Sequence, residues 1–512
     1  MRIGIDVGGT NTDAVLLDGH QVLASIKTST TEDVTSGIVA AIDGLQRQRA
    51  FDPASVRAVM IGTTHFINAL VEAHRLAPTA AVRLSLPAGA SLPPMVDWPK
   101  RLVDAVSGRS YLVHGGHEFD GRHIAELDEG ELRKAAEDMG GAGVRSVAIT
   151  SVFSPVNAEF EARAAEIIAD VLPDVAISLS HEIGRIGLLE RENATVINAA
   201  LRELAAHIVD GLAASVTGAG ITAPLYLSQN DGTLMDVDFA RRYPVATFAS
   251  GPTNSMRGAA VLSGLDTCAV VDVGGTTTDV GVLSQGFPRE ATTDVSVAGI
   301  RTNFRMPDVL SIGLGGGSRV RGETVGPDSV GYELTSRALV FGGDTLTATD
   351  IAVAAGRADI GDPALVAHLD RDMVRDALER IAANVSDVVE RMRTSAEPLP
   401  VVAVGGGSVL LPDELTGCGV VRRPENYAVA NAIGAAIAQI GGEVDRVYVI
   451  EPGRREVVVD EAKQEAIDRA VAAGASPASV SVVDFDEVPI PYLPGNATRI
   501  RVKAVGDLQL GA

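Results

Sequence analysis

A thirteen-residue stretch near the start of the chain returns almost unchanged 266 residues later, and this repeat constrains the fold more than any other feature. The first copy, residues 5–17, reads IDVGGTNTDAVLL, and the second, residues 271–283, reads VDVGGTTTDVGVL. Eight of the thirteen positions are identical. Each copy has the pattern of a buried strand, a turn rich in Gly and Thr, and a second strand. The repeat therefore predicts a duplicated half-molecule with a hairpin at the start of each half.

The turn of each copy combines residue types that suit a phosphate site. Paired glycines let the backbone adopt positive φ and approach a ligand closely, and successive main-chain N–H groups in such a turn form a concave anion site. An aspartate at the end of each first strand is placed to hold Mg²⁺ or its waters against a phosphate. We therefore predict that Mg²⁺ is bound by Asp6 and Asp272, and that phosphate is bound by Gly8, Gly9, Thr10, Asn11, Thr12, Gly274, Gly275, Thr276, Thr277 and Thr278.

A second aspartate closes each motif, at Asp13 and Asp279. Ordinary hairpins do not require an Asp before the glycines or a Thr-x-Thr-Asp after them. These two side chains are candidate catalytic groups that orient a nucleophile. They are equally suited to holding their hairpins closed by accepting backbone N–H groups, and both interpretations stay open.

Composition limits the classes of function. The 512 residues suffice for two or three domains, and 46% hydrophobic with 21% charged residues is ordinary for a soluble globular protein. A formal net charge of −23 argues against nucleic acid as the main partner. Two cysteines without a recognisable spacing suggest a reducing compartment. Because no apolar run is long enough for a membrane span and Met1 leads straight into a strand, we expect a cytoplasmic protein with no membrane partner.

Between and after the two copies, strand and helix patterns alternate, which predicts an α/β fold. Residues 78–107 are rich in Pro and are expected to be irregular. Two strand-to-helix turns carry small polar residues that could bind a substrate oxygen or merely cap a helix, namely Thr63, Thr64 and Asn68 in one and Ser250 and Gly251 in the other. A third glycine run after a predicted strand at 400–404 is suited to the adenosine of a nucleotide, through Gly405, Gly406 and Gly407.

Three histidines and two carboxylates lie within residues 114–123. Their spacing fits none of the strong zinc patterns. A metal site and a loop of solvated histidines both remain open, and the solvated loop is the interpretation we place first.

Several motifs together resemble a known family. The Asp-x-Gly-Gly-Thr-x-Thr-Asp hairpins are similar to the phosphate hairpins of the superfamily of actin, sugar kinases and heat-shock chaperone ATPases. Gly-Thr-Thr-x-x-x-Asn-Ala-Leu at 62–70, Ser-Gly-Pro at 250–252 and Ser-Ile-Gly-x-Gly-Gly-Gly-Ser at 311–318 resemble the hydantoinase/oxoprolinase A family within it. The resemblance implies an α/β fold of two actin-like (ribonuclease H-like) ATPase domains with a nucleotide cleft between them, plus a small C-terminal α+β extension. The implied domain limits are 1–185, 186–265 (a connecting segment), 266–440 and 441–512.

The resemblance further implies an ATP- and Mg²⁺-dependent hydrolase that opens a cyclic amide, such as a hydantoin or 5-oxoproline, through a phosphorylated amide. It implies a homo-oligomer or a second hydantoinase-type subunit as partner. Alternatives are a ketone carboxylase subunit of the acetone or acetophenone type, a small-molecule kinase, and a non-enzymatic ATP-gated clamp. The family usually has Ala-Gly-Gly where this chain has Thr253-Asn254-Ser255. We expect these side chains to narrow the space there or to offer new donors. The chain also resembles a short form of the family.

Overall fold

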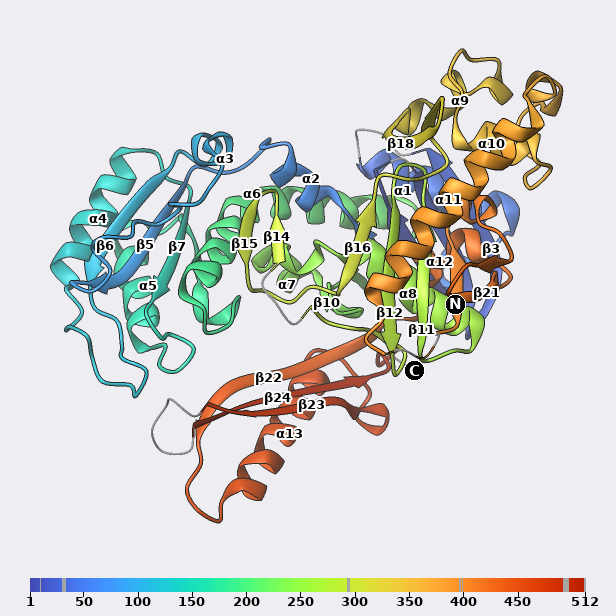
Figure 1. Cartoon of the computed structure of the whole chain (residues 1–512). Helices are drawn as coiled ribbons and strands as arrows, with labels where there is room; N and C mark the ends of the chain where they lie inside the picture. Colours follow the sequence, from blue (N-terminus) through green and yellow to red (C-terminus); the bar gives the residue numbers. More distant parts are fainter. Residues whose placement is uncertain are drawn as a thin grey trace.

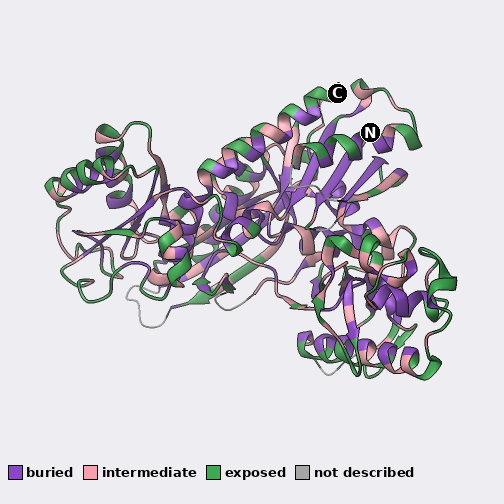
Figure 2. Cartoon of the chain, turned by 90° about the horizontal axis from the view of Figure 1, so that it is seen from above, coloured by how far each residue is buried: buried purple, intermediate pink, exposed green. Residues whose placement is uncertain are grey.

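The computed structural model describes residues 1–9, 11–29, 34–291, 295–395, 397, 399–490 and 497–510. Within them the protein is a mixed α/β molecule built on three large sheets (Figure 1). The predicted fold class is confirmed at this level. Figure 2 shows that the strands are mostly buried, while the outer faces of the helices are exposed.

The first copy of the repeated motif lies near one edge of a nine-stranded sheet. The strand order is β23-β24-β22-β10-β9-β4-β1-β2-β3. The strands are β1 (Arg2–Val7), β2 (Asn11–Asp18), β3 (Gln21–Ser29), β4 (Ala58–Thr63), β9 (Leu225–Ser228), β10 (Thr233–Asp236), β22 (Gln439–Val449), β23 (Ser481–Pro489) and β24 (Ala497–Gly506). β1 pairs with β2 in antiparallel and with β4 in parallel.

The second copy begins a seven-stranded sheet with the same local arrangement. Here β11 pairs with β12 in antiparallel and with β19 in parallel, and β12 also pairs with β13 and β16. The strands are β11 (Cys268–Val273), β12 (Thr278–Ser284), β13 (Phe287–Pro288), β16 (Val309–Ile312), β19 (Val401–Val404), β20 (Glu414–Leu415) and β21 (Gly419–Arg422). The cross-strand partners Asp6↔Asp13 and Asp272↔Asp279 occupy equivalent register positions.

Helices α8 (Ser250–Ser263) and α12 (Ala430–Ile437) form a shared layer between these two sheets. α12 packs on β1, β2 and β4, α8 packs on β11, β12 and β19, and the two helices pack on each other. The opposite face of the first sheet is covered by α1 (Val34–Gln48) and α6 (Leu188–Gly218), and that of the second by α10 (Ala348–Ala354) and α11 (Arg371–Met392). Alternation along the strands explains this layering, because Ile3 and Ile5 join one core while Val15 and Leu17 join the other.

A four-stranded parallel sheet forms a separate lobe, in the order β6-β5-β7-β8. Its elements are β5 (Thr79–Leu86), α3 (Lys100–Ala105), β6 (Arg109–His114), α4 (Glu129–Gly141), β7 (Ser146–Ser151), α5 (Glu159–Val171) and β8 (Ala176–Leu179). The expectation that residues 78–107 are irregular was therefore wrong. β5 is a central strand whose buried Arg83 forms a two-point ion pair with Glu192 of α6, with Nε–Oε2 at 2.6 Å and Nη2–Oε1 at 2.5 Å.

The C-terminal strands extend the first sheet rather than standing apart from it. β22 pairs with β10 in parallel and with β24 in antiparallel, and α13 (Arg455–Ala472) covers β22 and β24. Smaller elements complete the chain: α2 (His65–Val71), α7 (Val237–Arg242), β14 (Val295–Val297), β15 (Ile300–Thr302), β17 (Ser318–Arg321), β18 (Thr324–Ser329) and α9 (Leu334–Arg337). Among the residues that the structure describes, no helix is both long and apolar enough to cross a membrane.

Candidate functional site

The first hairpin turn is closed by a backbone hydrogen bond from Gly8 N to Asn11 O at 3.0 Å. Gly9 is exposed, and a Cβ built on it would meet no atom within 4 Å, so open space adjoins the turn. Thr10 lies outside the described residues, and Thr12 is buried. The turn is therefore accessible to a ligand at its tip and anchored at its base.

The second hairpin has the same closure, from Gly274 N to Thr277 O at 2.9 Å. The glycine-rich loop at 313–318 lies directly against it, because Gly316 N donates to Gly274 O at 3.0 Å and Gly317 N donates to Gly275 O at 2.7 Å. Thr276 is half-buried, Thr277 is exposed, and Thr278 donates from Oγ1 to Leu314 O at 2.6 Å. The glycine-rich motif at 311–318, which resembles the hydantoinase/oxoprolinase A pattern, thus holds the second hairpin through three hydrogen bonds.

Helix α8 connects the two hairpins through adjacent side chains. Asn254 Nδ2 donates to Asp6 Oδ1 at 3.3 Å, and Ser255 Oγ donates to Asp272 Oδ2 at 2.5 Å. These are the positions at which the chain departs from the resembling family. The expectation of new donors is met here in a specific form, since each departure bonds one of the two aspartates predicted to hold Mg²⁺.

Two further polar groups, which the sequence reasoning did not connect with the hairpins, complete the surroundings of the first one. Asn431 Nδ2, at the start of α12, donates to Asp6 Oδ2 at 3.0 Å and to Asp13 Oδ2 at 2.8 Å. Lys27 of β3 bonds Asp13, with Nζ at 2.7 Å from Oδ2. Lys27 also approaches the other half of the molecule, where its Cε lies 4.0 Å from a Cβ built on Gly406.

The charges of three motif aspartates, Asp6, Asp13 and Asp272, act on one another, and Asp279 is affected by Asp272. Burial, and then the charge of Asp13, raise the pKa of Asp6 to about 6, and Asp272 adds to the shift. Burial also raises the pKa of Asp272, against the hydrogen bond from Ser255 and the charge of Lys27. The pKa of Asp279 is raised to about 6 by burial and by Asp272, although Ser311 Oγ hydrogen-bonds its carboxylate. The site thus gathers more negative charge than Lys27 balances.

The third glycine run lies against the second hairpin. Gly405 has φ +80°, and a Cβ on it would fall 2.2 Å from Asp272 Oδ1, so only glycine fits. A Cβ on Gly407 would lie 2.9 Å from Gly274 O. Gly405, Gly406 and Gly407 therefore form the wall next to Asp272, with Lys27 facing Gly406 from the other sheet.

The weaker substrate candidates gather beside the first hairpin. Thr63 and Ser250 bond each other, from Thr63 N to Ser250 Oγ at 3.3 Å and from Ser250 Oγ to Thr63 O at 3.2 Å. Thr64 Oγ1 donates to Val7 O at 3.4 Å, and Asn68 Nδ2 lies 3.5 Å from Thr64 Oγ1. Gly251 lies beside Thr64, because a Cβ built on Gly251 would be 3.7 Å from Thr64 Cγ2. Most of these polar groups are engaged with one another or with the backbone, although the N-cap residues Thr64 of α2 and Ala249 of α8 make no side-chain capping bond.

A cavity of about 830 Å³ lies elsewhere, and its lining contains none of the hairpin residues. Charged side chains from the C-terminal strands and the central segment face it, among them Arg185, Asp231, Arg305, Asp445 and Lys503. Its wall reaches the start of α8 through Asn230, whose Oδ1 accepts from Ala249 N at 2.8 Å.

Comparison with known proteins identifies relatives over most of the chain. Residues 2–172 match the family model described as "Hydantoinase/oxoprolinase N-terminal region", and residues 191–392 match "Hydantoinase/oxoprolinase". The chain is 27% identical over 489 residues to caprolactamase subunit alpha of Pseudomonas jessenii, covering 88% of this chain and 68% of that protein. It is 26% identical over 394 residues to the acetophenone carboxylase gamma subunit of Aromatoleum aromaticum, covering 69% of this chain and 53% of that protein.

Among solved structures, the ATP-dependent caprolactamase of Pseudomonas jessenii aligns with a TM-score of 0.81 at 19% identity. This alignment covers 99% of this chain and 88% of that one. The likeness shows a shared fold. This chain spans about half to two thirds of the length of the curated relatives it matches.

Proposed function

The chain belongs to the hydantoinase/oxoprolinase family, and from this premise we propose that it is an ATP-dependent hydrolase that opens a cyclic amide of the hydantoin or 5-oxoproline kind. The observation that carries the proposal is the pair of equivalent hairpins, held to one helix by Asn254 and Ser255, with four carboxylates in electrostatic range. Two anion-binding turns that are both joined to one helix suit a triphosphate better than a single anion. We propose accordingly that the two sheets are the halves of an actin-like ATPase.

The proposed roles follow the chemistry of the groups. Residues 8–12 and 274–278 bind phosphates, and residues 405–407 bind the adenosine. Asp6 and Asp272 hold Mg²⁺, since carboxylate oxygens are its preferred protein ligands and the raised pKa values mark charge that a cation would relieve. Bound Mg²⁺ would supply neutralisation of the phosphate charge. Asn254, Ser255 and Asn431 fix the carboxylates so that little reorganisation is needed.

The second aspartates have different surroundings, and we propose different roles for them. Asp13 is engaged by Lys27 and Asn431, which suits a positioning residue that keeps the first hairpin closed. Asp279 has a pKa of about 6, so its carboxylate is a stronger base than an ordinary one while still mostly ionised at neutral pH. We propose that Asp279 accepts a proton from the nucleophile.

The proposed reaction consumes one ATP and two water molecules for each amide bond that it opens. The amide oxygen attacks the γ-phosphorus of ATP and the bond to ADP breaks, which leaves an O-phosphorylated imidate. A first water adds to the imidate carbon and the ring C–N bond breaks, with the nitrogen leaving as the protonated amine and the carbonyl carbon left as an acyl phosphate. A second water cleaves the acyl phosphate, giving a ring-opened acid, ADP and phosphate. Alignment of the reacting oxygen with the γ-phosphate is the main demand on the protein.

A second candidate function is favoured by a specific observation. The acetophenone carboxylase relative, named a gamma subunit, covers 69% of this chain. The same nucleotide core would then phosphorylate an oxygen in a ketone carboxylation. Because the caprolactamase and the acetophenone carboxylase relatives are both named as subunits, we propose that a second, hydantoinase-type subunit is needed for either activity.

The test is ADP release by the purified chain, alone and with a candidate partner subunit, in the presence of Mg²⁺. The acceptor panel comprises cyclic amides, hydroxyl compounds, and a ketone with bicarbonate. We expect stimulation by a cyclic amide. Stimulation only by the ketone with bicarbonate favours the carboxylase, and stimulation only by a hydroxyl compound indicates a kinase. No stimulation by any compound, together with stimulation by a protein alone, refutes the enzyme proposal.

The magnesium assignment has its own variant. Asp272→Asn is expected to lower turnover about 100-fold or more, because changing even the hydrogen-bond partner of a metal ligand costs about 10–100-fold. The matched control is Asp266→Asn, because Asp266 is exposed two residues before the same strand. An Asp272→Asn variant that turns over nucleotide like the wild type rules out this assignment.

A further inference from the structure

A compact histidine cluster lies in the lobe of the four-stranded sheet, at the other end of the molecule from the paired hairpins in Figure 1. After β6 the chain makes a tight loop whose two ends, His117 and His123, form an antiparallel bridge. Glu118 N donates to Arg122 O at 2.7 Å inside this loop. The bridge brings the two imidazoles to the first residue of α5, Glu159. From the sequence alone, two interpretations of these histidines stayed open, a metal site and a loop of solvated side chains.

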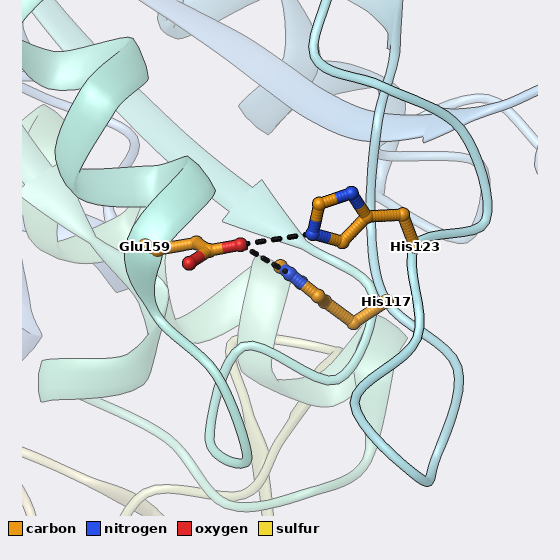
Figure 3. A group of neighbouring side chains, drawn as sticks. All are labelled: His117, His123 and Glu159. Carbon is orange, nitrogen blue, oxygen red and sulfur yellow. Dashed lines mark hydrogen bonds and ion pairs between the residues drawn. The ribbon is translucent and has the colours of Figure 1, made fainter.

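Both imidazoles point at one carboxylate oxygen, as Figure 3 shows. His117 Nε2 lies 3.2 Å and His123 Nε2 lies 3.0 Å from Glu159 Oε1. His117 has no exposed side-chain surface, so the expectation of solvated histidines was wrong for this residue. Phe160 packs on both rings, with centroid distances of 4.5 and 4.7 Å. The ring orientations are thus set by packing and by the bridge.

His123 faces a carboxylate with each of its nitrogens. Its Nδ1 lies 3.1 Å from Glu126 Oε1 while its Nε2 faces Glu159. A neutral imidazole carries only one N–H. In one of the two contacts, therefore, the lone pair of a nitrogen would face a negatively charged carboxylate oxygen and be repelled, unless a cation lies between them. That cation is either a second proton or a metal ion. A carboxylate on the outer nitrogen of a histidine is also the usual arrangement around metal-bound imidazoles.

The distances suit a metal. With bonds of about 2.0–2.1 Å to nitrogen and oxygen, ligand atoms around a tetrahedral Zn²⁺ are separated by about 3.3 Å. The two Nε2–Oε1 separations of 3.2 and 3.0 Å are close to this spacing, and the three ligand atoms all lie within 4.8 Å of one another. The side chains of His123 and Glu159 are 36% and 52% exposed, so solvent reaches the site from one side.

We propose that His117, His123 and Glu159 bind a divalent transition metal, Zn²⁺ first of all, with a fourth coordination position open to water or to an oxygen anion. Three protein ligands with one open position are the pattern of exchangeable sites, whereas closed structural zinc sites use four protein ligands. Two imidazoles select Zn²⁺ over Mg²⁺, so the chain would hold chemically distinct metals at its two ends. This inference does not depend on the proposed function.

A neighbouring cluster of similar composition serves as an internal comparison. His114 contacts Glu131, and Asp128 lies close by. There the carboxylates are already used by the backbone, because Asp128 caps α4 through Gly130 N and Glu131 N, and Glu131 accepts from His114 N. Glu159 Oε1, in contrast, has the two imidazoles directed at it. We therefore assign the metal to the His117–His123–Glu159 cluster alone.

The test is direct binding of Co²⁺ to the metal-free full chain, followed by visible absorption, with Zn²⁺ as competitor. We expect one tightly bound Co²⁺ per chain with the intense bands of a low-coordinate nitrogen–oxygen site. Zn²⁺ should displace it, and Mg²⁺ in large excess should not. Both cysteines are buried, which limits thiolate binding of the probe.

The variants Glu159→Gln and His123→Gln change half-exposed side chains and are expected to fold, which the fluorescence of Trp98 checks. Each should weaken Co²⁺ binding at least about tenfold. The matched controls His114→Gln and His20→Gln should bind Co²⁺ like the wild type. The proposal is overturned if the wild-type chain binds no stoichiometric Co²⁺, or if the Glu159 and His123 variants bind it unchanged. Neither readout involves nucleotide turnover, so a failure here leaves the proposed hydrolase untouched.

Discussion

Replacing Asp6 by Asn should make the ligand-free protein more stable at neutral pH. The pKa of Asp6 is about 6 in the folded protein against an ordinary value of 3.8. A carboxyl whose pKa is raised by folding binds its proton more tightly in the folded state. Stability therefore falls as pH rises from about 4 to 6, and the loss is complete above that range. A shift of about two units corresponds to about 3 kcal/mol at pH 7.5.

The Asn side chain cannot ionise, so the variant escapes this loss. It also forfeits part of the hydrogen bonding with Asn254 and Asn431, worth about 1 kcal/mol. The pH dependence separates the two effects. At pH 4.5 the electrostatic advantage shrinks to about 1 kcal/mol, because Asp6 is then mostly protonated in the folded state. The variant's advantage over the wild type should therefore grow by about 2 kcal/mol between pH 4.5 and pH 7.5, whatever the hydrogen bonds contribute.

Urea unfolding followed by Trp98 fluorescence measures this difference. Trp98 is the sole tryptophan, is 7% exposed, and packs in the same core as Ile3 and Ile5 of the hairpin strand. The control is Asp18→Asn, the same substitution at the exposed end of β2, away from the motif carboxylates. With Mg²⁺ and ATP the order should reverse, because only the wild type gains from binding. An advantage that is constant or that shrinks toward pH 7.5 refutes the reasoning.

Two further predictions concern packing. Arg83→Met should lower the free energy of unfolding by about 3–5 kcal/mol, because it leaves Glu192 buried without its partner. The double variant Arg83→Met with Glu192→Met should recover most of this loss in urea unfolding. A single variant that is as stable as the wild type would contradict this prediction. Gly434→Ala would place a Cβ 1.8 Å from Asn254 O and should destabilise by about 3 kcal/mol or more, whereas Gly141→Ala, with no atom within 4 Å of its Cβ, should be close to neutral in the same assay. Equal effects of the two glycine changes would show that the close contact of α8 and α12 is not limiting.

The parts of the fold that could be predicted from the sequence are those that depend on residues close to one another along the chain. The twin hairpins and the strand–helix alternation follow from periodicity within about fifteen residues. Strand β5 was missed because it carries Arg83, and a charged residue in a buried strand looks like a loop. Its neutralising partner, Glu192, is 109 residues away and invisible to any local pattern.

The candidate site divides in the same way. Asp6 and Asp272 were predicted as Mg²⁺ ligands. Asp13 and Asp279 were predicted either to orient a nucleophile or to hold their hairpins closed, and all four roles stay predictions. Lys27 was not predicted, since a lysine on a strand carries no signal of its own. Asn431 reaches Asp13 across 418 residues, and only the packing of α12 on β1 and β2 brings them together. Residues 253–255 depart from the family pattern, and this departure predicted new hydrogen-bond donors. It did not predict that these donors bond Asp6 and Asp272.

The helix pair α8–α12 has a mechanical consequence. Adjacent residues of α8 grip one hairpin each, and α8 meets α12 with backbone against backbone at Gly258 and Gly434, where no side chain could yield. α12 ends at Ile437 and β22 begins at Gln439. The two helices are in such close backbone contact that they are expected to move as one unit. Any movement of one hairpin relative to the other must therefore pass through this helix pair, and β22, which follows α12 directly and pairs with β10 and β24, is expected to move with the first sheet.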